Sequence, residues 1–330
     1  MRYLGIDVHS RASVWCLLDE QGEVCGRGHV ETTGPALESL VTELSANDKL
    51  RVGQEVGRMI ASSRKKTDRR DAYWIARALQ SGMHPHPVYM PTGEIRELRA
   101  LLSRRRLILV DRNRWQHRAH SLLRGSGLRI QPGSYRLGAA IEKLLASPTG
   151  LDAYACESLE LCQRQQAALT IELQRVEAQV RQHSRQIDAI RRLQTIPAVG
   201  PLTSTTIYAW VGDVSRFPNA KALAAYAGLV PEVRQSGGAS HLGSITKMGA
   251  KALRSTLVQA SHVLISQCRT AEAIPLQAIA QRVRGSRGRR KIAVVALARH
   301  LLRIAYYILR DATEYEASRL EHAQEDRAVV

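Results

Sequence analysis

The longest periodic pattern in the chain is a run of alternating three- and four-residue steps from Leu159 to Gln194. Eight of its eleven positions are apolar, which indicates a long helix with one buried stripe. Sustained over about five heptads, the pattern predicts a coiled coil, formed either between two chains or within one. We expect a dimer contact ahead of an intramolecular hairpin. The positions are Leu159, Cys162, Gln166, Leu169, Leu173, Val176, Val180, His183, Ile187, Ile190 and Gln194.

The N-terminal segment shows a different pattern, of short apolar runs separated by turns. Three runs in succession predict an antiparallel meander, and a helical segment and a fourth strand follow it. This order predicts an α/β domain in which the fourth strand can pair in parallel with the first. The predicted strands are 3–9, 13–20, 24–30 and 50–57, and the predicted helix is 32–45.

The next segments are mostly helical in pattern. A helix is predicted from Thr67 or Asp68 to Gly82, and a Pro-rich break covers 85–94. From Arg96 to Arg124 nine arginines stand against two acids, which predicts one long basic helix able to follow phosphates. We expect domains at 1–92, 93–194 and 195–315, the last mainly helical with a Gly/Ser loop at 235–243, and a disordered tail at 316–330.

The charge of the chain indicates its partners. Lysine and arginine number 48 against 30 acids, a net charge of +18, and only eight of the cations are lysine. Guanidinium groups bind phosphate oxygens in pairs, so nucleic acid is the first partner to expect. We find no membrane-spanning run and no export signal, and five cysteines without a CxxC pair fit a reducing cytosol. A cytoplasmic protein without a membrane partner is expected.

Four carboxylates interrupt this basic background. Asp7 stands in the middle of the first predicted strand and Glu55 near the end of the fourth, while Asp68 and Asp71 share the first turn of a helix. If the two strands are parallel neighbours, the four carboxylates can form one cluster that suits Mg²⁺ or Mn²⁺ in phosphodiester chemistry. Two alternatives remain open. Asp68 and Asp71 can be ordinary first-turn acids that pair with arginines, and Asp7 loosely fits an actin-like phosphate loop.

Several motifs carry a resemblance to a known family. YLGIDVHS, QEVG and KKTDRRDAYWIARAL stand in the first part of the chain; LQTIPAVGP, FPNAKALAAYAGLVPEVRQSGG and ITKMGAKALRSTL stand in the second. In this order they resemble the DEDD insertion-sequence transposases, serine-dependent recombinases guided by a bridge RNA. The resemblance covers nearly the whole chain. It implies a RuvC-like domain of RNase H fold, a coiled-coil dimerisation region and a C-terminal transposase domain.

The resemblance also implies the site. Asp7, Glu55, Asp68 and Asp71 would bind Mg²⁺ or Mn²⁺, and Ser236 would be the nucleophile that attacks DNA. The implied partners are DNA, a guide RNA and further copies of the chain, as a dimer or a tetramer. Taken alone, a serine before Gly-Gly is a weak signal, because such residues are common in turns.

Phosphate contacts are expected at cations near these motifs and at the glycine of the IPAVGP turn, which a helix-hairpin-helix module would offer to a phosphate. A simple helix connection and a solvated basic face explain the same residues equally well. His84 and His86 are a weaker metal pair. The candidate nucleic-acid-binding residues are Lys65, Lys66, Arg69, Arg70, Arg104, Arg105, Arg106, Gly200, Lys247 and Arg254.

One spacing departs from the family pattern. Asp68 follows Glu55 by thirteen positions, too few for the helix and strand that the family has there. The resemblance therefore implies an internal deletion near 58–60 in a shortened RuvC-like domain. The predicted function is an RNA-guided DNA transposase. The alternatives are a RuvC-like nuclease that uses water, and a nucleic-acid-binding remnant without catalysis.

Overall fold

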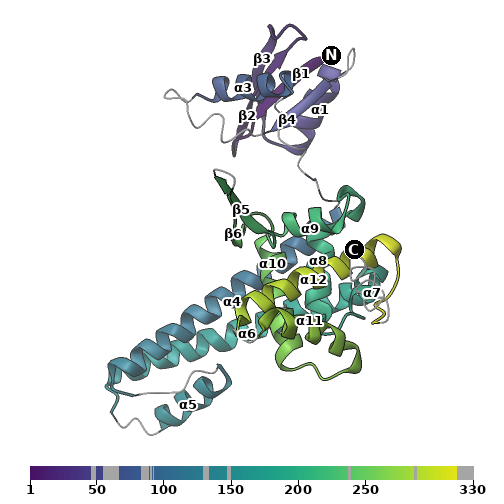
Figure 1. The fold of residues 1–330 in the computed structure, drawn as a ribbon. Helices are drawn as coiled ribbons and strands as arrows, with labels where there is room; N and C mark the ends of the chain where they lie inside the picture. Colours follow the sequence, from purple (N-terminus) through teal and green to yellow (C-terminus); the bar gives the residue numbers. More distant parts are fainter. Residues whose placement is uncertain are drawn as a thin grey trace, which may run out of the picture. The chain divides into compact units, whose positions relative to one another are not determined.

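The chain forms two compact units in the computed structural model, Met1–Met90 and Pro91–Val330 (Figure 1). The structure describes residues 1–45, 50–54, 67–82, 89, 91, 93–128, 134–146, 150–236, 239–285 and 288–317. The predicted deletion site, the two histidines at 84 and 86, and most of the predicted tail lie outside these residues.

The first unit is built on a four-stranded sheet in the order β3-β2-β1-β4. The first three strands pair antiparallel, and β4 pairs with β1 in parallel. The predicted meander is therefore confirmed, and the parallel pairing on which the proposed carboxylate cluster depends is present. The strands are β1 (Arg2–Asp7), β2 (Ala12–Leu18), β3 (Val24–Glu31) and β4 (Leu50–Gln54).

Helices α1 (Gly34–Ser45) and α3 (Asp68–Gln80) cover opposite faces of this sheet. Successive side chains of a strand point to opposite faces, so each strand contributes to two cores. On β1, Leu4 and Ile6 pack with the apolar side chains of α1. On β2, Val14 and Cys16 pack with the small residues of α3. The sheet is thus buried on both sides, with α3 on the face to which Asp7 belongs.

In the second unit, α4 (Gly93–Gly125) and α6 (Ala153–Gln186) form a long helical hairpin (Figure 1). Helix α5 (Ser134–Ala146) lies between them in the chain, near the closed end of the hairpin. Leu123 of α4 packs with Leu159 of α6, while Arg105 bonds to Glu177 further along, so the helices run antiparallel. The heptad stripe is therefore covered within the chain. The intramolecular hairpin, the second of the two predicted arrangements, is thus present, and a dimer contact in this region stays a prediction.

The predicted continuous helix to Gln194 is also interrupted. Ile187 has extended backbone angles, φ −103° and ψ 113°, and a short new helix, α7 (Asp188–Leu193), starts after it. Asp188 favours this new start, since an acid in a first turn complements the helix dipole. On α7, Ile190 and Leu193 are both fully buried, and Leu193 belongs to the next core of the unit.

The next core is built on α12 (Arg290–Asp311), whose residues Leu297, Leu301 and Ala305 are fully buried. By length and composition α12 could cross a membrane, but its burial is that of a core helix. The other elements of this unit are α8 (Pro201–Val211), η1 (Val214–Arg216), α9 (Ala220–Tyr226), β5 (Pro231–Ser236), β6 (Ala239–Ile245), α10 (Lys251–Ser266), η2 (Ala271–Ala273) and α11 (Ile274–Arg284).

The Gly/Ser loop predicted at 235–243 is wrong over all of its described part, where the chain forms the antiparallel hairpin of β5 and β6. Pro231 pairs with Ile245 at one end and Ser236 with Ala239 at the other. Backbone groups form a ladder whatever the side chains are, so a segment of small residues can be a strand despite its low strand propensity.

Candidate functional site

Three titratable side chains meet at the carboxyl end of β1. His9 Nε2 lies 3.1 Å from Asp7 Oδ2 and 3.4 Å from Asp68 Oδ2. One ligand atom from each of the three residues lies within 4.8 Å of the other two. Asp7 and Asp68 come from elements about sixty positions apart in the chain, so the cluster is a product of the fold.

A close helix-to-strand contact holds Asp68 beside Asp7. A Cβ at Gly5 would lie 2.1 Å from the Ala72 carbonyl oxygen and 2.5 Å from the Ala76 backbone nitrogen. Only a residue without a side chain allows α3 to approach β1 this closely. Ala72 and Ala76 are fully buried, and their small size serves the same approach. The sequence therefore brings the first turn of α3 over the end of β1.

The environment of Asp7 disfavours its negative charge. Burial raises the pKa of the Asp7 carboxyl, the nearby His9 lowers it, and the charges of Asp71 and Asp68 raise it again, with a net rise. Carboxylates forced together in a partly buried site repel one another, and a cation between them removes that repulsion. A site of this electrostatic character can bind a divalent metal ion.

The predicted tetrad is thus partly brought together. Asp7, Asp68 and Asp71 share one region of the first unit, and Asp71 is one turn along α3 from Asp68. Glu55 lies outside the described residues. Ile6 of β1 pairs with Gln54, the last residue of β4 and the one before Glu55. The tetrad as a metal site therefore stays a prediction.

Sequence reasoning missed His9. The available signal was its position two residues after Asp7, because side chains two apart on extended backbone point to the same side. The imidazole adds a nitrogen donor to the carboxylate oxygens, and nitrogen is tolerated better by Mn²⁺, a transition-metal ion, than by Mg²⁺, although both ions prefer oxygen.

Ser236 is the last residue of β5, at the turn end of the β5–β6 hairpin in the second unit. Its backbone is in the ladder opposite Ala239. The surroundings of its hydroxyl lie outside what the structure describes, and its role as the nucleophile stays a prediction.

The predicted phosphate contacts on α4 differ in their surroundings. Arg105 binds Glu177 with two nitrogens, at 2.8 and 2.6 Å, and Arg104 lies 3.3 Å from Glu172. These bonds link α4 to α6. Arg106 is exposed, with no ion pair to another described residue, and is the best placed of the three for a phosphate.

The other predicted contacts are spread over both units. Arg69 and Arg70 are exposed on α3, and Lys65 and Lys66 lie outside the described residues. Lys247 is exposed, whereas Arg254 donates from Nη1 to the Ala227 carbonyl oxygen at 2.8 Å. That bond gives Arg254 a structural role at the end of α9.

Both interpretations of the IPAVGP turn, a phosphate-binding turn and a simple helix connection, remain open. Gly200 is exposed at the start of α8, where backbone N–H groups point outward. A pocket of about 460 Å³ beside it is lined by the turn and by Cys268, Thr270 and Glu272. The Glu272 carboxylate would repel a phosphate in this pocket, which weighs against phosphate binding there.

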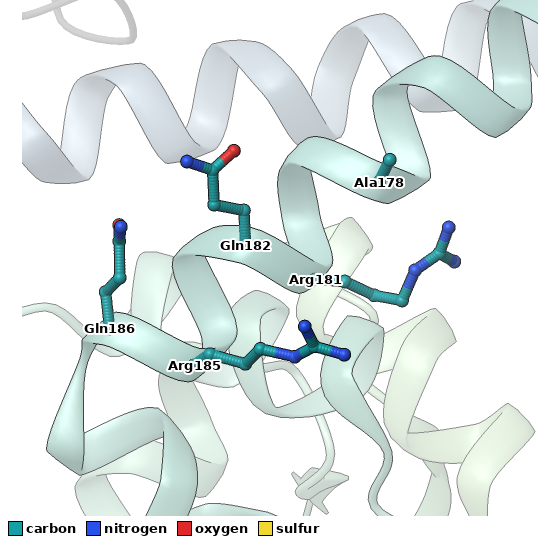
Figure 2. Close-up of a pocket in the computed structure, with 5 residues that line it drawn as sticks. All are labelled: Ala178, Arg181, Gln182, Arg185 and Gln186. Carbon is teal, nitrogen blue, oxygen red and sulfur yellow. The ribbon is translucent and has the colours of Figure 1, made fainter.

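A shallow basic pocket of about 350 Å³ lies on α6 (Figure 2). Arg181 and Arg185, one turn apart, extend in the same direction, and Gln182 and Gln186 border them. All of its described lining comes from a single helix. Such a surface suits loose contact with a phosphate backbone.

Two family models match the chain. The model described as "Transposase IS116/IS110/IS902 family" matches residues 190–274, which include the serine hairpin. The DEDD transposase model of the IS110 group, described as "Transposase", matches residues 54–127, which include Asp68 and Asp71.

Curated relatives agree with these matches. The chain is 27% identical over 257 residues to the "Probable family 20 transposase" of Pseudomonas aeruginosa, covering 76% of this chain and 75% of the relative. It is 31% identical to the "Transposase for insertion sequence element IS1111A" of Coxiella burnetii, covering 61% and 55%. It is 35% identical to the "Pilin gene-inverting protein" of Moraxella lacunata over 38% of each chain. The second alignment thus spans about half of that relative, and the third less.

Proposed function

Because the chain is a DNA transposase of the IS110/IS116 family of DEDD-type insertion-sequence enzymes, we propose that it cuts and rejoins DNA strands with a metal centre and a serine nucleophile. The DEDD domain implies an RNase H-like fold for the first unit, which its α/β sheet supports. The observation that carries the proposal is the meeting of Asp7, His9 and Asp68 at the end of β1.

The residues present fit a divalent ion. Asp7 and Asp68 would hold it through carboxylate oxygens, His9 through Nε2, and Asp71 and Glu55 would complete the site. The raised pKa of Asp7 supports this assignment, since a cation offsets the repulsion that contributes to the rise. When bound, the ion would supply positive charge that stabilises a phosphate while a bond to it forms or breaks.

The strand cleavage itself would be carried out by a residue of the chain. The Ser236 hydroxyl would attack phosphorus, forming a serine–DNA phosphodiester and releasing a DNA hydroxyl that carries the proton. That intermediate keeps the energy of the broken bond and can be rejoined to a second strand. The 35% identity to a pilin gene-inverting protein over 125 residues supports strand exchange rather than simple cleavage.

Further copies of the chain and an RNA complete the proposal. The net charge of +18 exceeds what a few phosphate contacts need, which favours a large nucleic-acid surface of DNA and guide RNA. Because the heptad stripe is covered by α4, a dimer would form through other surfaces of the hairpin.

The test is a covalent trap. Purified protein is incubated with labelled DNA of its element ends, the RNA encoded beside them and Mg²⁺ or Mn²⁺, and protein–DNA adducts are separated under denaturing conditions. We expect an adduct that is lost in Ser236→Ala and kept in Ser244→Ala, a change at an exposed serine of the same hairpin. Cleavage with a free hydroxyl and no adduct would instead establish a nuclease that uses water. Salt-sensitive binding without cleavage would establish a binding remnant.

A further inference from the structure

A second basic pocket lies between α9 and α12. Its volume is about 500 Å³, within the range of roughly 300–1,000 Å³ usual for ligand sites. Its described lining contains three cations and a histidine but no carboxylate. The lining residues are Asn219, Ala220, Lys221, Ala224, Ala296, Arg299, His300, Arg303 and Tyr307.

The pocket is rigidly built. One side of α12 is buried in the core of the second unit through residues such as Leu301 and Ile304. On its pocket side, Arg299, Arg303 and Tyr307 recur every four residues and therefore form one stripe along the helix. The opposite wall is α9, whose start is fixed by Asn219, which accepts a hydrogen bond from the Ala222 backbone nitrogen at 2.9 Å.

The cations are spaced along a line. Arg299 and Arg303 lie one turn apart, about 6 Å along the axis of α12, and Lys221 faces them from α9. His300 Nδ1 lies 3.2 Å from a guanidinium nitrogen of Arg303, which helps to orient that side chain. A row of cations suits an extended polyanion better than one compact anion.

An aromatic ring stands at the end of this row. The Tyr307 side chain is 43% exposed, and the Arg310 guanidinium lies 4.8 Å from the centre of its ring. Tyr306 packs edge-on against Tyr307, with centroids 5.4 Å apart, and its hydroxyl donates to the Phe217 carbonyl oxygen. The Tyr307 ring is thus held at the surface by a residue that is itself anchored.

We propose that this pocket binds single-stranded nucleic acid, with phosphates on Lys221, Arg299 and Arg303 and a base stacked on Tyr307. A basic groove that follows the backbone, together with an aromatic platform, is the recurrent means of binding unpaired strands. In a duplex the bases are stacked on one another, and Tyr307 would have no base face to contact. The strand can be DNA or RNA, which share this chemistry.

The test measures binding of fluorescent 20-nucleotide single strands, one of DNA and one of RNA, to the full chain. The pocket variant is Arg299→Gln with Arg303→Gln. Its matched control is Arg164→Gln with Arg175→Gln, which removes the same charge from exposed positions on α6. The aromatic variant is Tyr307→Ala, and Tyr307→Phe keeps the ring. Circular dichroism and thermal melting check that every variant is folded.

We expect the pocket variant to reduce the slope of log affinity against log salt by about 1.4, at about 0.7 for each phosphate that the protein no longer neutralises. The control variant, Arg164→Gln with Arg175→Gln, should change this slope by less. Tyr307→Ala should weaken binding roughly ten-fold, and Tyr307→Phe should not. An effect confined to one oligonucleotide identifies that polymer as the ligand. Equal effects of the pocket and control variants on both strands would overturn the proposal, and so would an unchanged Tyr307→Ala.

Discussion

Gly5 of β1 lies directly beneath the backbone of Ala72 in α3, so closely that a methyl group at Gly5 would stand 2.1 Å from the Ala72 carbonyl oxygen. The contact connects the sheet to the helix that carries Asp68 and Asp71. Any increase in the distance between α3 and β1 therefore moves these acids away from Asp7. The geometry of the candidate metal centre therefore depends on a glycine that has no side chain with which to bind a metal ion.

Gly5→Ala should both destabilise the first unit and separate the cluster. Overpacking of this kind costs about 1–3 kcal/mol, because the neighbour is backbone and cannot rotate away. Chemical denaturation measures the change in the free energy of unfolding. Gly34→Ala is the control, since nothing lies within 4 Å of a methyl group there. Equal stability of the two variants would contradict the close contact.

Asp7→Asn should stabilise the protein at neutral pH in the absence of metal. The pKa of Asp7 is raised in the folded state, so the folded protein holds this proton more tightly than the unfolded chain does. The free energy of unfolding consequently falls as pH rises from the ordinary Asp value through the raised one. Removing the charge avoids that loss, with a gain on the order of 0.5–2 kcal/mol, as is common for stabilising substitutions.

Thermal melting at several pH values checks this prediction. The difference between Asp7→Asn and the unaltered chain should be largest at neutral pH and should shrink below about pH 4, where both forms are neutral at this position. The same concentration of a divalent ion should raise the melting temperature of the unaltered chain more than that of Asp7→Asn, since binding stabilises the state that binds. A less stable Asp7→Asn protein at neutral pH without metal would contradict the account.

Much of the first unit could be predicted from local patterns. The short apolar runs of β1 and β2 and the helical spacing before Ser45 were enough to predict the meander, the helix and a fourth strand, while the parallel pairing of that strand with β1 was left as a condition. His9 was missed because its role depends on the approach of Asp68, sixty-one positions after Asp7. That approach is set by Gly5 and two alanines, which carry no chemical signal of their own.

Leu159→Ala should destabilise the second unit to the same extent at every protein concentration. Leu159 is fully buried against α4 of the same chain, so its removal leaves a cavity that costs about 2–5 kcal/mol. Leu161, two positions on, is 41% exposed, and Leu161→Ala should change stability by about 0.5 kcal/mol or less. Denaturation at two protein concentrations about a hundred-fold apart measures whether the free energy of unfolding depends on concentration. A concentration-dependent loss in Leu159→Ala would restore the dimer interpretation.

Arg254→Ala and Lys247→Gln should separate a structural cation from a surface one. Arg254 bonds to the Ala227 carbonyl oxygen, and a hydrogen bond from a charged donor contributes about 1.5–3 kcal/mol. Lys247 is exposed, and its loss should change stability by about 0.5 kcal/mol or less. Urea denaturation compares the two variants. Equal stabilities would show that Arg254 is as dispensable to the fold as Lys247.

In the second unit, the periodicity of apolar residues was not sufficient to predict which elements pack together. A heptad stripe shows that one face of a helix is buried, but it carries no information on which helix covers it, and α4 proved to be that helix. The prediction of a loop in place of the β5–β6 hairpin was wrong because the residues there carry too little pattern, not because a pattern was misassigned. The small residues of this hairpin have little preference for a strand, and the pairing of Ser236 with Ala239 comes from backbone bonds.

The most direct test of the central claim is a calorimetric titration of the full chain with Mn²⁺ and with Mg²⁺. The account predicts that Asp7→Asn and Asp68→Asn each weaken binding of both ions at least about ten-fold, while Glu38→Gln, at an exposed acid of α1, does not. His9→Ala should weaken the binding of Mn²⁺ more than that of Mg²⁺, because Mn²⁺ accepts a nitrogen ligand more readily than Mg²⁺ does. Unchanged affinities in Asp7→Asn and Asp68→Asn would show that the cluster at the end of β1 is not the metal centre.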